Sequence, residues 1–402
     1  MANKNGGFIG TDGLDAPDPP TAVTPTAGDG QLSIAFTAPT DTGTSAITGF
    51  VAQVASSGDN YSAGSNTGTS SPIVVSSLSN GTSYTAKVWA INAYGTSAPS
   101  DASTGVSPAA IRGLYAGGYN GSSYYNTIDY IEIATTGNAT DFGDLATARY
   151  TLSGVSSSTR GVFGGGDQSA FTTIEYVTFS TTSNTTDFGD LTVGRYALGG
   201  LSNATRGVFA AGYNSSNATT NTLDYITIAS AGNATDFGDT TASAQGTSGS
   251  QSSTRGIINI GFISDASNKI DYITIASTGN AADFGDLTQG RWFGGACSSS
   301  VRALCAGGQG GSPSYPILNI IDYITIASTG NATDFGDLLS VNLYTTGTSN
   351  STRGVFGGSN NSNVIQYVTI ASTGNATDFG DLTTSGTVQG TGACSNGHGG
   401  LA

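Results

Sequence analysis

The strongest constraint on the fold of this chain is a repeat that fills residues 109–402. Three phrases recur in each copy: a hydrophobic segment such as RGVFGGG, a segment such as IDYITIA, and GNATDFGDL or a close variant. An arginine opens each copy and returns every 46 to 51 residues, at Arg112, Arg160, Arg206, Arg255, Arg302 and Arg353. Six copies of about 48 residues, each reading as four short strands, have the spacing of the blades of a β-propeller.

The two ends of the repeat array complement each other. The first copy begins directly at Arg112, without the Arg-aromatic segment that precedes later copies at Arg149-Tyr150, Arg195-Tyr196 and Arg291-Trp292. The last copy ends with an extra strand-like segment near residues 386–394. We expect this C-terminal strand to pair beside the strand that starts at Arg112, because joining the ends removes exposed sheet edges.

The order of these segments resembles the kelch family over about 290 residues. An Arg-aromatic strand is followed by a hydrophobic strand ending in Gly-Gly, a third strand such as LDYITIA, and a turn with one aromatic residue. The tryptophan that the family carries in its last strand is replaced here by phenylalanine, as in Phe142. The resemblance implies a six-bladed kelch-like β-propeller over residues 109–402, closed by the C-terminal strand.

Residues 21–108 have the pattern of a separate β-sandwich. Runs such as QLSIAF and YTAKVWA alternate apolar and polar residues, as half-buried strands do. The stretch LSNGTSYTAKVWAINAYGTSAPS, from Leu78 to Ser100, resembles the fibronectin type III family, with Tyr84 placed like its corner tyrosine and Phe36 where the family often has tryptophan. The resemblance implies a spacer domain. Residues 1–20 are polar and end in DAPDPP, which predicts an extended N-terminal arm.

Charge and composition exclude several partners. Twelve Lys and Arg against 27 Asp and Glu give a net charge of −15, the wrong sign for nucleic acid or an anionic lipid surface. No segment approaches the roughly 20 apolar residues of a membrane span, so no membrane insertion is expected, and no secretion signal is visible. The three cysteines are too few for a disulfide framework, and a bridge between Cys297 and Cys305 is left open.

Side chains suited to catalysis are scarce. The one histidine, His398, lies in a Gly-rich C-terminal tail, whereas zinc hydrolases, copper oxidases and Ser-His-Asp hydrolases need histidines that the fold holds in place. We therefore expect His398 to be a bystander. The protein is predicted not to be an enzyme, with no catalytic or metal-binding residues and no cofactor except calcium as an open alternative.

Calcium stays open because each repeat carries two aspartates three residues apart, such as Asp236 and Asp239. Such spacing, with a nearby Asn, suits calcium ligation or glycosidase acid-base work. A catalytic pair is needed once, however, and this pair is copied six times. We therefore favour turn capping and Asp–Arg pairing between strands and blades, and we expect Arg206 and its counterparts to pair with carboxylates.

The segments between the second and third strands vary most between repeats. They carry Tyr, Ser, Gly and Asn, the residue types of adaptable binding surfaces, because tyrosine gives contact area at low entropic cost. In a four-stranded meander these loops emerge on one face and the uniform GNATDFGDL turns on the other. The predicted ligand-binding residues are Tyr119, Asn120, Tyr124, Tyr125, Phe171, Tyr213 and Tyr315.

The repeats, the arm and the fibronectin type III-like module together resemble virion-attached tail fibre or decoration proteins of tailed phages that infect marine bacteria. The resemblance implies a structural and adhesion protein of the virion, located outside the cell. Its arm would hold other virion proteins, and its propeller would meet a glycan or protein of the host surface or decorate the particle. A bacterial surface or secreted adhesin and a glycan-active propeller enzyme are the alternatives.

Overall fold

The computed structural model describes residues 15–167, 171–359 and 362–401. The chain divides into two compact units, with the boundary between Ala110 and Ile111. Both units are built from β-strands, and the one helical element in the described ranges is a single 3-10 turn, η1, at Gly399–Leu401. No helix in these ranges is long and apolar enough to cross a membrane. The prediction of an all-β chain is confirmed.

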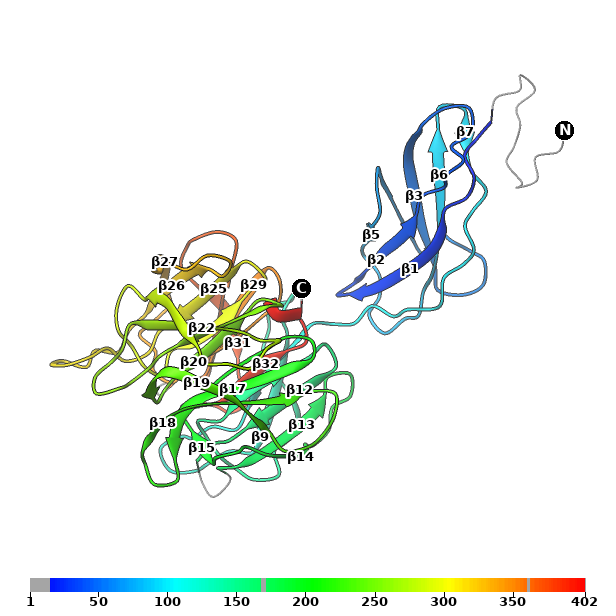
Figure 1. Cartoon of the computed structure of the whole chain (residues 1–402). Coiled ribbons are helices and arrows are strands. Elements are labelled where there is room, and N and C mark those ends of the chain that lie inside the picture. Colours follow the sequence, from blue (N-terminus) through cyan, green and yellow to red (C-terminus); the bar gives the residue numbers. More distant parts are fainter. Residues whose placement is uncertain (1–14, 168–170, 360–361, 402) are drawn as a thin grey trace. The chain divides into compact units, whose positions relative to one another are not determined.

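The N-terminal unit consists of two antiparallel sheets (Figure 1). Their strand orders are β1-β2-β5 and β4-β3-β6-β7. The strands are β1 Thr21–Gly28, β2 Gln31–Thr37, β3 Ile47–Ala55, β4 Gly64–Gly68, β5 Ile73–Val75, β6 Thr85–Asn92 and β7 Gly95–Thr96. Every second residue of β2 and β6 is buried, as the alternating pattern predicts.

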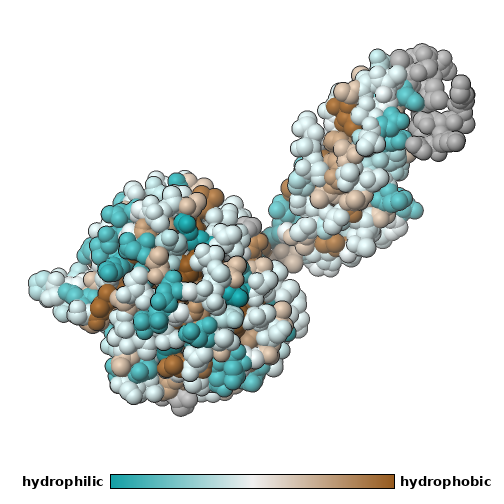
Figure 2. Space-filling model, viewed as in Figure 1, coloured by the Kyte–Doolittle hydropathy of each residue, from teal (hydrophilic) through white to brown (hydrophobic). Residues whose placement is uncertain are grey.

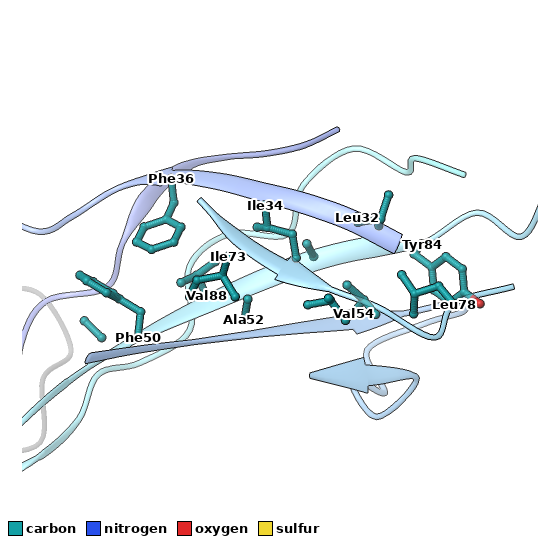
Figure 3. Close-up of a cluster of buried hydrophobic side chains, with 13 residues drawn as sticks. Leu32, Ile34, Phe36, Phe50, Ala52, Val54, Ile73, Leu78, Tyr84 and Val88 are labelled. Atoms are coloured by element: carbon teal, nitrogen blue, oxygen red, sulfur yellow. The ribbon is translucent and has the colours of Figure 1, made fainter. Parts of the chain in front are cut away.

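The core of this unit lies between the two sheets (Figure 3). Phe36, at the position where we expected a phenylalanine in place of a tryptophan, is buried, and its ring centroid lies 4.8 Å from that of Phe50. At the other end of the core, the hydroxyl of Tyr84 accepts a hydrogen bond from the N–H of Ser79 at 3.1 Å. The corner tyrosine of such sandwiches makes the same kind of hydrogen bond, from its hydroxyl to the backbone a few residues upstream.

The predicted arm falls largely outside the described residues, but its last part, residues 15–20, contacts the sandwich. The N–H of Thr44 donates to the carbonyl of Asp15, and Asn92 Nδ2 donates to the same oxygen at 2.9 Å. Ala16 is 7% exposed, and the N–H of Asp18 donates to the carbonyl of Asp41. These residues are therefore held by the N-terminal unit and do not form a free linker.

The C-terminal unit contains six antiparallel sheets, which we number by the repeat that supplies their second strand (Figure 1). The first strands of sheets 1 to 6 are β32 Gly392–Ser395, β11 Ser153–Ser156, β16 Gly199–Ser202, β20 Ser248–Gln251, β24 Gly295–Ser298 and β28 Thr346–Ser349. The second strands are β8 Arg112–Ala116, β12 Arg160–Gly164, β17 Arg206–Asn214, β21 Arg255–Asn259, β25 Arg302–Ala306 and β29 Arg353–Gly357.

The third and fourth strands complete each sheet. The third strands are β9 Thr127–Glu132, β13 Thr173–Thr178, β18 Thr219–Thr227, β22 Lys269–Thr274, β26 Ile320–Thr325 and β30 Val364–Thr369. The fourth strands are β10 Thr140–Asp144, β14 Thr186–Asp190, β19 Thr235–Ala244, β23 Ala282–Asp286, β27 Thr333–Asp337 and β31 Thr377–Asp381. Sheet 3 has a fifth strand, β15 Arg195–Tyr196, which pairs with β17.

Sheet 1 is assembled from both ends of the repeat array. The C-terminal strand β32, red in Figure 1, pairs antiparallel with β8, with Cys394 opposite Leu114 and Ala393 opposite Tyr115. The predicted pairing of the C-terminal segment with the strand that starts at Arg112 is confirmed. The six sheets remain separate, and the first strand of each contacts the first strands of its two neighbours, with β28 of sheet 6 contacting β32 of sheet 1.

The GNATDFGDL phrase joins neighbouring sheets, which explains why it recurs. In each sheet the N–H of its second aspartate donates to the asparagine side chain of the next sheet at 3.1 Å, as from Asp239 to Asn280. The glycine between the two aspartates has a positive φ, 141° at Gly238, and a Cβ there would lie 2.6 Å from the backbone of Gly279 in the next sheet. Only glycine allows this approach. The same bond runs from Asp381 of sheet 6 to Asn138 of sheet 1.

Within the described residues, the arginines that open the repeats do not pair with carboxylates, so that prediction was wrong. Arg206 Nη1 donates to the carbonyl of Ile275 in the next sheet at 3.0 Å, and its guanidinium lies 4.2 Å from the ring centroid of Tyr225 in its own sheet. The other five repeat the arrangement, and Arg353 reaches Ile133 of sheet 1 at 2.9 Å. Each of these arginines donates a hydrogen bond to a carbonyl oxygen just after the third strand of the next sheet, where the chain turns away.

The second set of arginines, those before aromatic residues, forms the buried ion pairs. Arg195 Nη2 lies 2.6 Å from Asp224 Oδ2 and Arg291 Nη2 lies 2.5 Å from Asp322 Oδ2, with both partners of each pair buried. Arg149 lies 3.1 Å from Glu175 in the same way. The acidic partner stands in the third strand, in segments such as LDYITIA, and not in GNATDFGDL.

The other three sheets lack this arginine. In sheet 6 the aligned positions hold two amides, Asn342 and Gln366. Sheets 1 and 4 keep the carboxyl, as Asp129 and Asp271, without an ion-pair partner in the described ranges. Burial raises the pKa of both carboxyls, and hydrogen bonds from a threonine of the preceding sheet, Thr383 to Asp129 and Thr241 to Asp271, oppose that shift.

Candidate binding face

The loops between second and third strands lie beside the linkers that lead into the first strands. In sheets 1 and 2, the N–H of Gly118 donates to the carbonyl of Arg149 at 2.9 Å, and the N–H of Arg149 donates to the carbonyl of Tyr125 at 3.1 Å. We call the surface formed by these loops and linkers the loop face. The turns that join first to second and third to fourth strands lie at the opposite end of each sheet.

A first aromatic cluster on the loop face joins two predicted residues with one that was not predicted to bind. The rings of Tyr119 and Tyr124 stack with centroids 4.7 Å apart, and both lie within 5.5 Å of Tyr150. All three side chains are partly exposed. Burial raises the pKa of Tyr150, and nearby Asp167 adds to the shift, so its hydroxyl stays protonated.

Asn120 and Tyr125, also predicted to bind ligand, hold the loop together instead. Asn120 Oδ1 accepts hydrogen bonds from the N–H groups of Ser122 and Ser123, and Asn120 Nδ2 donates to the Tyr125 hydroxyl at 2.7 Å. The ring of Tyr125 packs on a buried cluster that includes Val388. These two residues therefore set the shape from which Tyr119 and Tyr124 project.

A second cluster joins sheets 2 and 3. Tyr196 lies between the predicted residues Phe171 and Tyr213, with centroid distances of 5.8 Å and 5.4 Å. The hydroxyl of Tyr213 accepts a hydrogen bond from Gln245 Nε2 at 2.9 Å. The structure thus brings together residues that are 42 positions apart in sequence.

A third cluster was missed at the sequence level. Phe262, Trp292, Phe293 and Tyr344 form a chain of ring contacts with successive centroid distances of 5.1, 4.7 and 4.3 Å. The signal for this cluster in the sequence is the Arg-aromatic pair, as in Arg291-Trp292, which by itself indicates only the start of a strand. Because the arginine is buried against the third strand, the next residue is placed on the loop face.

Tyr315 stands apart from the three clusters. It is 45% exposed and lies in the long loop between β25 and β26, where its N–H donates to the carbonyl of Gly311. Asp265 of the neighbouring sheet accepts a hydrogen bond from the N–H of Ser312 at 2.9 Å and so attaches this loop to sheet 4. Among the predicted residues, Tyr315 is the one with the most exposed ring.

At the centre of the loop face, one residue from each sheet adopts a left-handed backbone. We call these six residues the mouth ring: Gly390, Thr151, Ala197, Gly246, Phe293 and Tyr344. Backbone hydrogen bonds of 2.6 to 3.0 Å run from Thr151 to Gly390, from Ala197 to Thr151, from Gly246 to Ala197 and from Phe293 to Gly246. Phe293 and Tyr344 follow with their rings 4.3 Å apart.

The members of the mouth ring other than Gly246 line a cavity of about 80 Å³. Below the ring its wall is made of glycines, hydroxyl-bearing residues such as Ser153 and Ser248, and the aliphatic side chains of Leu152 and Leu198. None of the described residues that line it is charged. Thr345 also lines it, and its buried hydroxyl has no hydrogen-bond partner in the described part of the chain.

The far ends of the first strands form a second ring. It consists of Ser395, Ser156, Ser202, Gln251, Ser298 and Ser349, and each serine hydroxyl donates to the carbonyl of the preceding member at 2.5 to 2.9 Å. We call it the serine ring. It encloses a smaller cavity of about 40 Å³.

That His398 takes no part in catalysis stays a prediction, but the residue does not lie in a free tail: it packs against the serine ring. It is 5% exposed, its Nε2 lies 3.0 Å from the carbonyl oxygen of Ser156, and its Nδ1 lies 3.0 Å from Gln251 Nε2 and 3.1 Å from the N–H of Gly400. These partners assign a neutral ring with the proton on Nε2. Burial lowers its pKa to about 4. The C-terminal tail therefore covers the end opposite the mouth ring.

The repeated aspartates lie away from both rings. The first aspartate of each pair is exposed, as at Asp236, and the structure shows no group of three or more metal-capable His, Cys, Asp or Glu side chains in the ranges it describes. The ion pairs with arginine are made by other carboxylates, such as Asp224 with Arg195. The asparagine of the repeated phrase instead accepts a hydrogen bond from the neighbouring sheet, as Asn280 does from the N–H of Asp239. Cys297 and Cys305 are buried free thiols, and burial raises the pKa of both.

Comparison with known proteins bears on the N-terminal unit. No curated protein sequence matches the chain. The family model of the fibronectin type III domain matches residues 15–106, which span both sheets of the sandwich and begin at the residue where its first described contacts are made.

Proposed function

We propose that the six sheets are the blades of a kelch-like β-propeller and that the protein is a non-enzymatic recognition protein. Three kinds of contact that pass from each sheet to the next, and from sheet 6 back to sheet 1, support the propeller. They are the neighbouring first strands, the asparagine caps and the arginine–carbonyl bonds.

The observation that carries the binding role is the contrast between the two ends of the sheets. Ten aromatic rings, in three clusters, lie on the loop face, whereas the opposite turns are nearly identical and are used for contacts between sheets. Aromatic and small polar side chains on adaptable loops give contact area and hydrogen bonding at low entropic cost. On the side of the molecule that Figure 2 shows, hydrophobic residues are scattered among hydrophilic ones.

The lack of catalytic side chains at the mouth favours recognition over catalysis. A glycosidase needs two carboxyl groups beside its substrate, and no carboxylate occurs among the described lining residues of the mouth cavity. Asp129 and Asp271, whose pKa values are raised, belong to strands inside the sheets and do not line the mouth cavity.

In this proposal the N-terminal unit is a spacer and the loop face meets a glycan or protein of a host surface. We place the protein in the virion of a tailed phage, with a bacterial surface or secreted adhesin as the alternative setting. Mass spectrometry of purified virions separates the two, because the chain should be a virion component in the first case and absent in the second.

The binding role is tested with the purified full chain on a printed array of bacterial surface polysaccharides and on intact marine bacterial cells. Tyr124→Ala should reduce binding, whereas Tyr94→Ala, which removes a tyrosine 50% exposed on the sandwich, should not. Tyr124 is preferred to Tyr125 because the Tyr125 ring also supports the fold. Undiminished binding by Tyr124→Ala, together with its loss on Asp236→Lys at the opposite end, would show that the uniform end is the interface.

A further inference from the structure

We propose that the loop face docks a basic segment of a partner protein, and that an arginine side chain of this partner lies between the first and second aromatic clusters, beside Asp167. The inference rests on the proposed recognition function and names its partner. It follows from the charges of the C-terminal unit, the place of Asp167, the way this chain holds its own arginines, and the open shape of the loop face.

The C-terminal unit keeps almost no cationic group for a ligand. Its nine arginines are used inside the fold: six donate to carbonyls of the next sheet and three form buried ion pairs. The one lysine of this unit, Lys269, stands opposite Asp286 in the ladder of β22 and β23. Because the whole chain has a net charge of −15, its long-range field attracts cations and repels anions. An acidic or phosphorylated partner is therefore disfavoured.

Asp167 lies where the first and second clusters meet. Its N–H donates to the carbonyl of Tyr150 at 3.0 Å. Burial raises the pKa of Tyr150 and of Tyr196, and the charge of Asp167 adds to the shift in both, so the carboxylate is near one ring of each cluster. All three side chains are partly exposed, so a group from outside can reach them. A cation placed here meets a carboxylate and aromatic ring faces together.

The contacts of the chain's own arginines favour arginine as the incoming cation. In all six sheets the opening arginine stacks on the tyrosine of the third strand, with 4.2 to 4.7 Å between the guanidinium carbon and the ring centroid. Tyr150 and Tyr196 have no cation stacked on them among the described residues. Arginine suits this place better than lysine, because its planar group stacks on a ring while its N–H groups donate to a carboxylate.

The open shape of the loop face favours a protein over a small molecule. Sites for small ligands are usually cavities of about 300–1,000 Å³, whereas the mouth cavity measures about 80 Å³. The aromatic clusters lie on neighbouring loops and linkers, where a partner surface can cover them. Interfaces between proteins are rich in Tyr, Trp and Phe and poor in Lys and Glu. The described loops and linkers of the loop face match this composition, since they carry the three aromatic clusters and no glutamate.

The test uses fluorescence polarisation with the purified full chain and short labelled peptides that carry two arginines among Gly and Ser. Matched peptides carry lysine or citrulline instead, and citrulline has nearly the shape of arginine without its charge. We expect saturable binding of the arginine peptide, binding of the lysine peptide about threefold weaker, and binding of the citrulline peptide about tenfold weaker or more. Binding of the arginine peptide should also weaken as sodium chloride rises from about 50 to about 500 mM.

Two charge-matched variants locate the site. Asp167→Asn removes one negative charge beside the two clusters and should weaken binding of the arginine peptide about tenfold. Asp236→Asn removes the same charge from an exposed aspartate at the opposite end of sheet 3 and should leave the affinity nearly unchanged. Tyr196→Leu, which removes a ring but keeps an apolar side chain, should weaken binding about threefold. Urea unfolding shows whether each variant keeps the fold.

No binding of the arginine peptide, equal binding of the citrulline peptide, or equal effects of Asp167→Asn and Asp236→Asn would overturn the inference. Tighter binding of the lysine peptide would overturn it too, because stacking on tyrosine favours the guanidinium. Binding to polysaccharides or cells that depends on Tyr124 but not on Asp167 would also overturn it, while leaving the proposed function standing with a glycan as the partner.

Discussion

The burial of His398 predicts a specific loss of stability in mild acid. Its pKa is lowered from 6.5 to about 4 in the folded chain. Between these values the unfolded chain takes up a proton that the folded chain does not, so stability falls as the pH drops from about 6.5 to 4. At about 1.36 kcal/mol per pKa unit, the full loss from this group is about 3 kcal/mol.

Two measurements check this value. Because the chain has one histidine, a proton NMR titration gives a single imidazole signal, whose midpoint should lie near 4. Urea unfolding followed by tryptophan fluorescence at pH 7 and pH 4.5 should show a smaller loss for His398→Gln than for the natural chain. The raised pKa values of Asp129 and Asp271 act in the opposite direction but are common to both proteins. A midpoint near 6.5, or parallel losses in the two proteins, would refute the burial argument.

Three further predictions concern stability and are measured by urea unfolding at neutral pH. Arg206→Ala should cost about 2 kcal/mol, since it removes a charged hydrogen bond to Ile275 and a stacking contact; an unchanged midpoint would mean that this contact is superficial. Asp322→Asn should cost about 3–5 kcal/mol, because it leaves a buried arginine unpaired, whereas Asp271→Asn should cost less; equal losses would contradict the ion-pair argument. Gly238→Ala should destabilise more than Gly232→Ala, where a Cβ meets nothing within 4 Å, and the reverse order would show that sheets 3 and 4 do not approach as described.

Sequence reasoning predicted the elements that depend on pattern. The period of the arginines located the second strands, and the unmatched ends of the array led to the pairing of β32 with β8. The partners of the arginines could not be predicted, because charge alone suggests a carboxylate, whereas Arg206 meets the carbonyl that the next sheet leaves free where its third strand ends. The first aspartate of each GNATDFGDL phrase is exposed, whereas Asp224 and Asp322 of the third strands are buried, which the spacing of residues does not reveal.

The candidate site was predicted in its outer part and missed at its centre. Variable loops drew attention to Tyr119, Tyr124, Phe171 and Tyr213, and the structure places all four in aromatic clusters. The mouth ring lies in the linkers, where its members share a backbone conformation and not a residue type, so no sequence motif marks it. The Gly-rich composition of the tail gives no sign that the fold holds His398 in place, yet the glycines at 399 and 400 let the tail pass within contact distance of the serine ring.

The pairing of β32 with β8 has a mechanical consequence. A pull on the chain from its N-terminal unit reaches the C-terminal unit at Ile111, one residue before β8 begins. Hydrogen-bond ladders hold β8 along both edges, to β9 on one side and to β32 on the other. Tension at this entry point must therefore shear two ladders at once, whereas a first strand at the margin of its sheet would be held by one. The C-terminal strand β32 thus anchors the strand that bears the load.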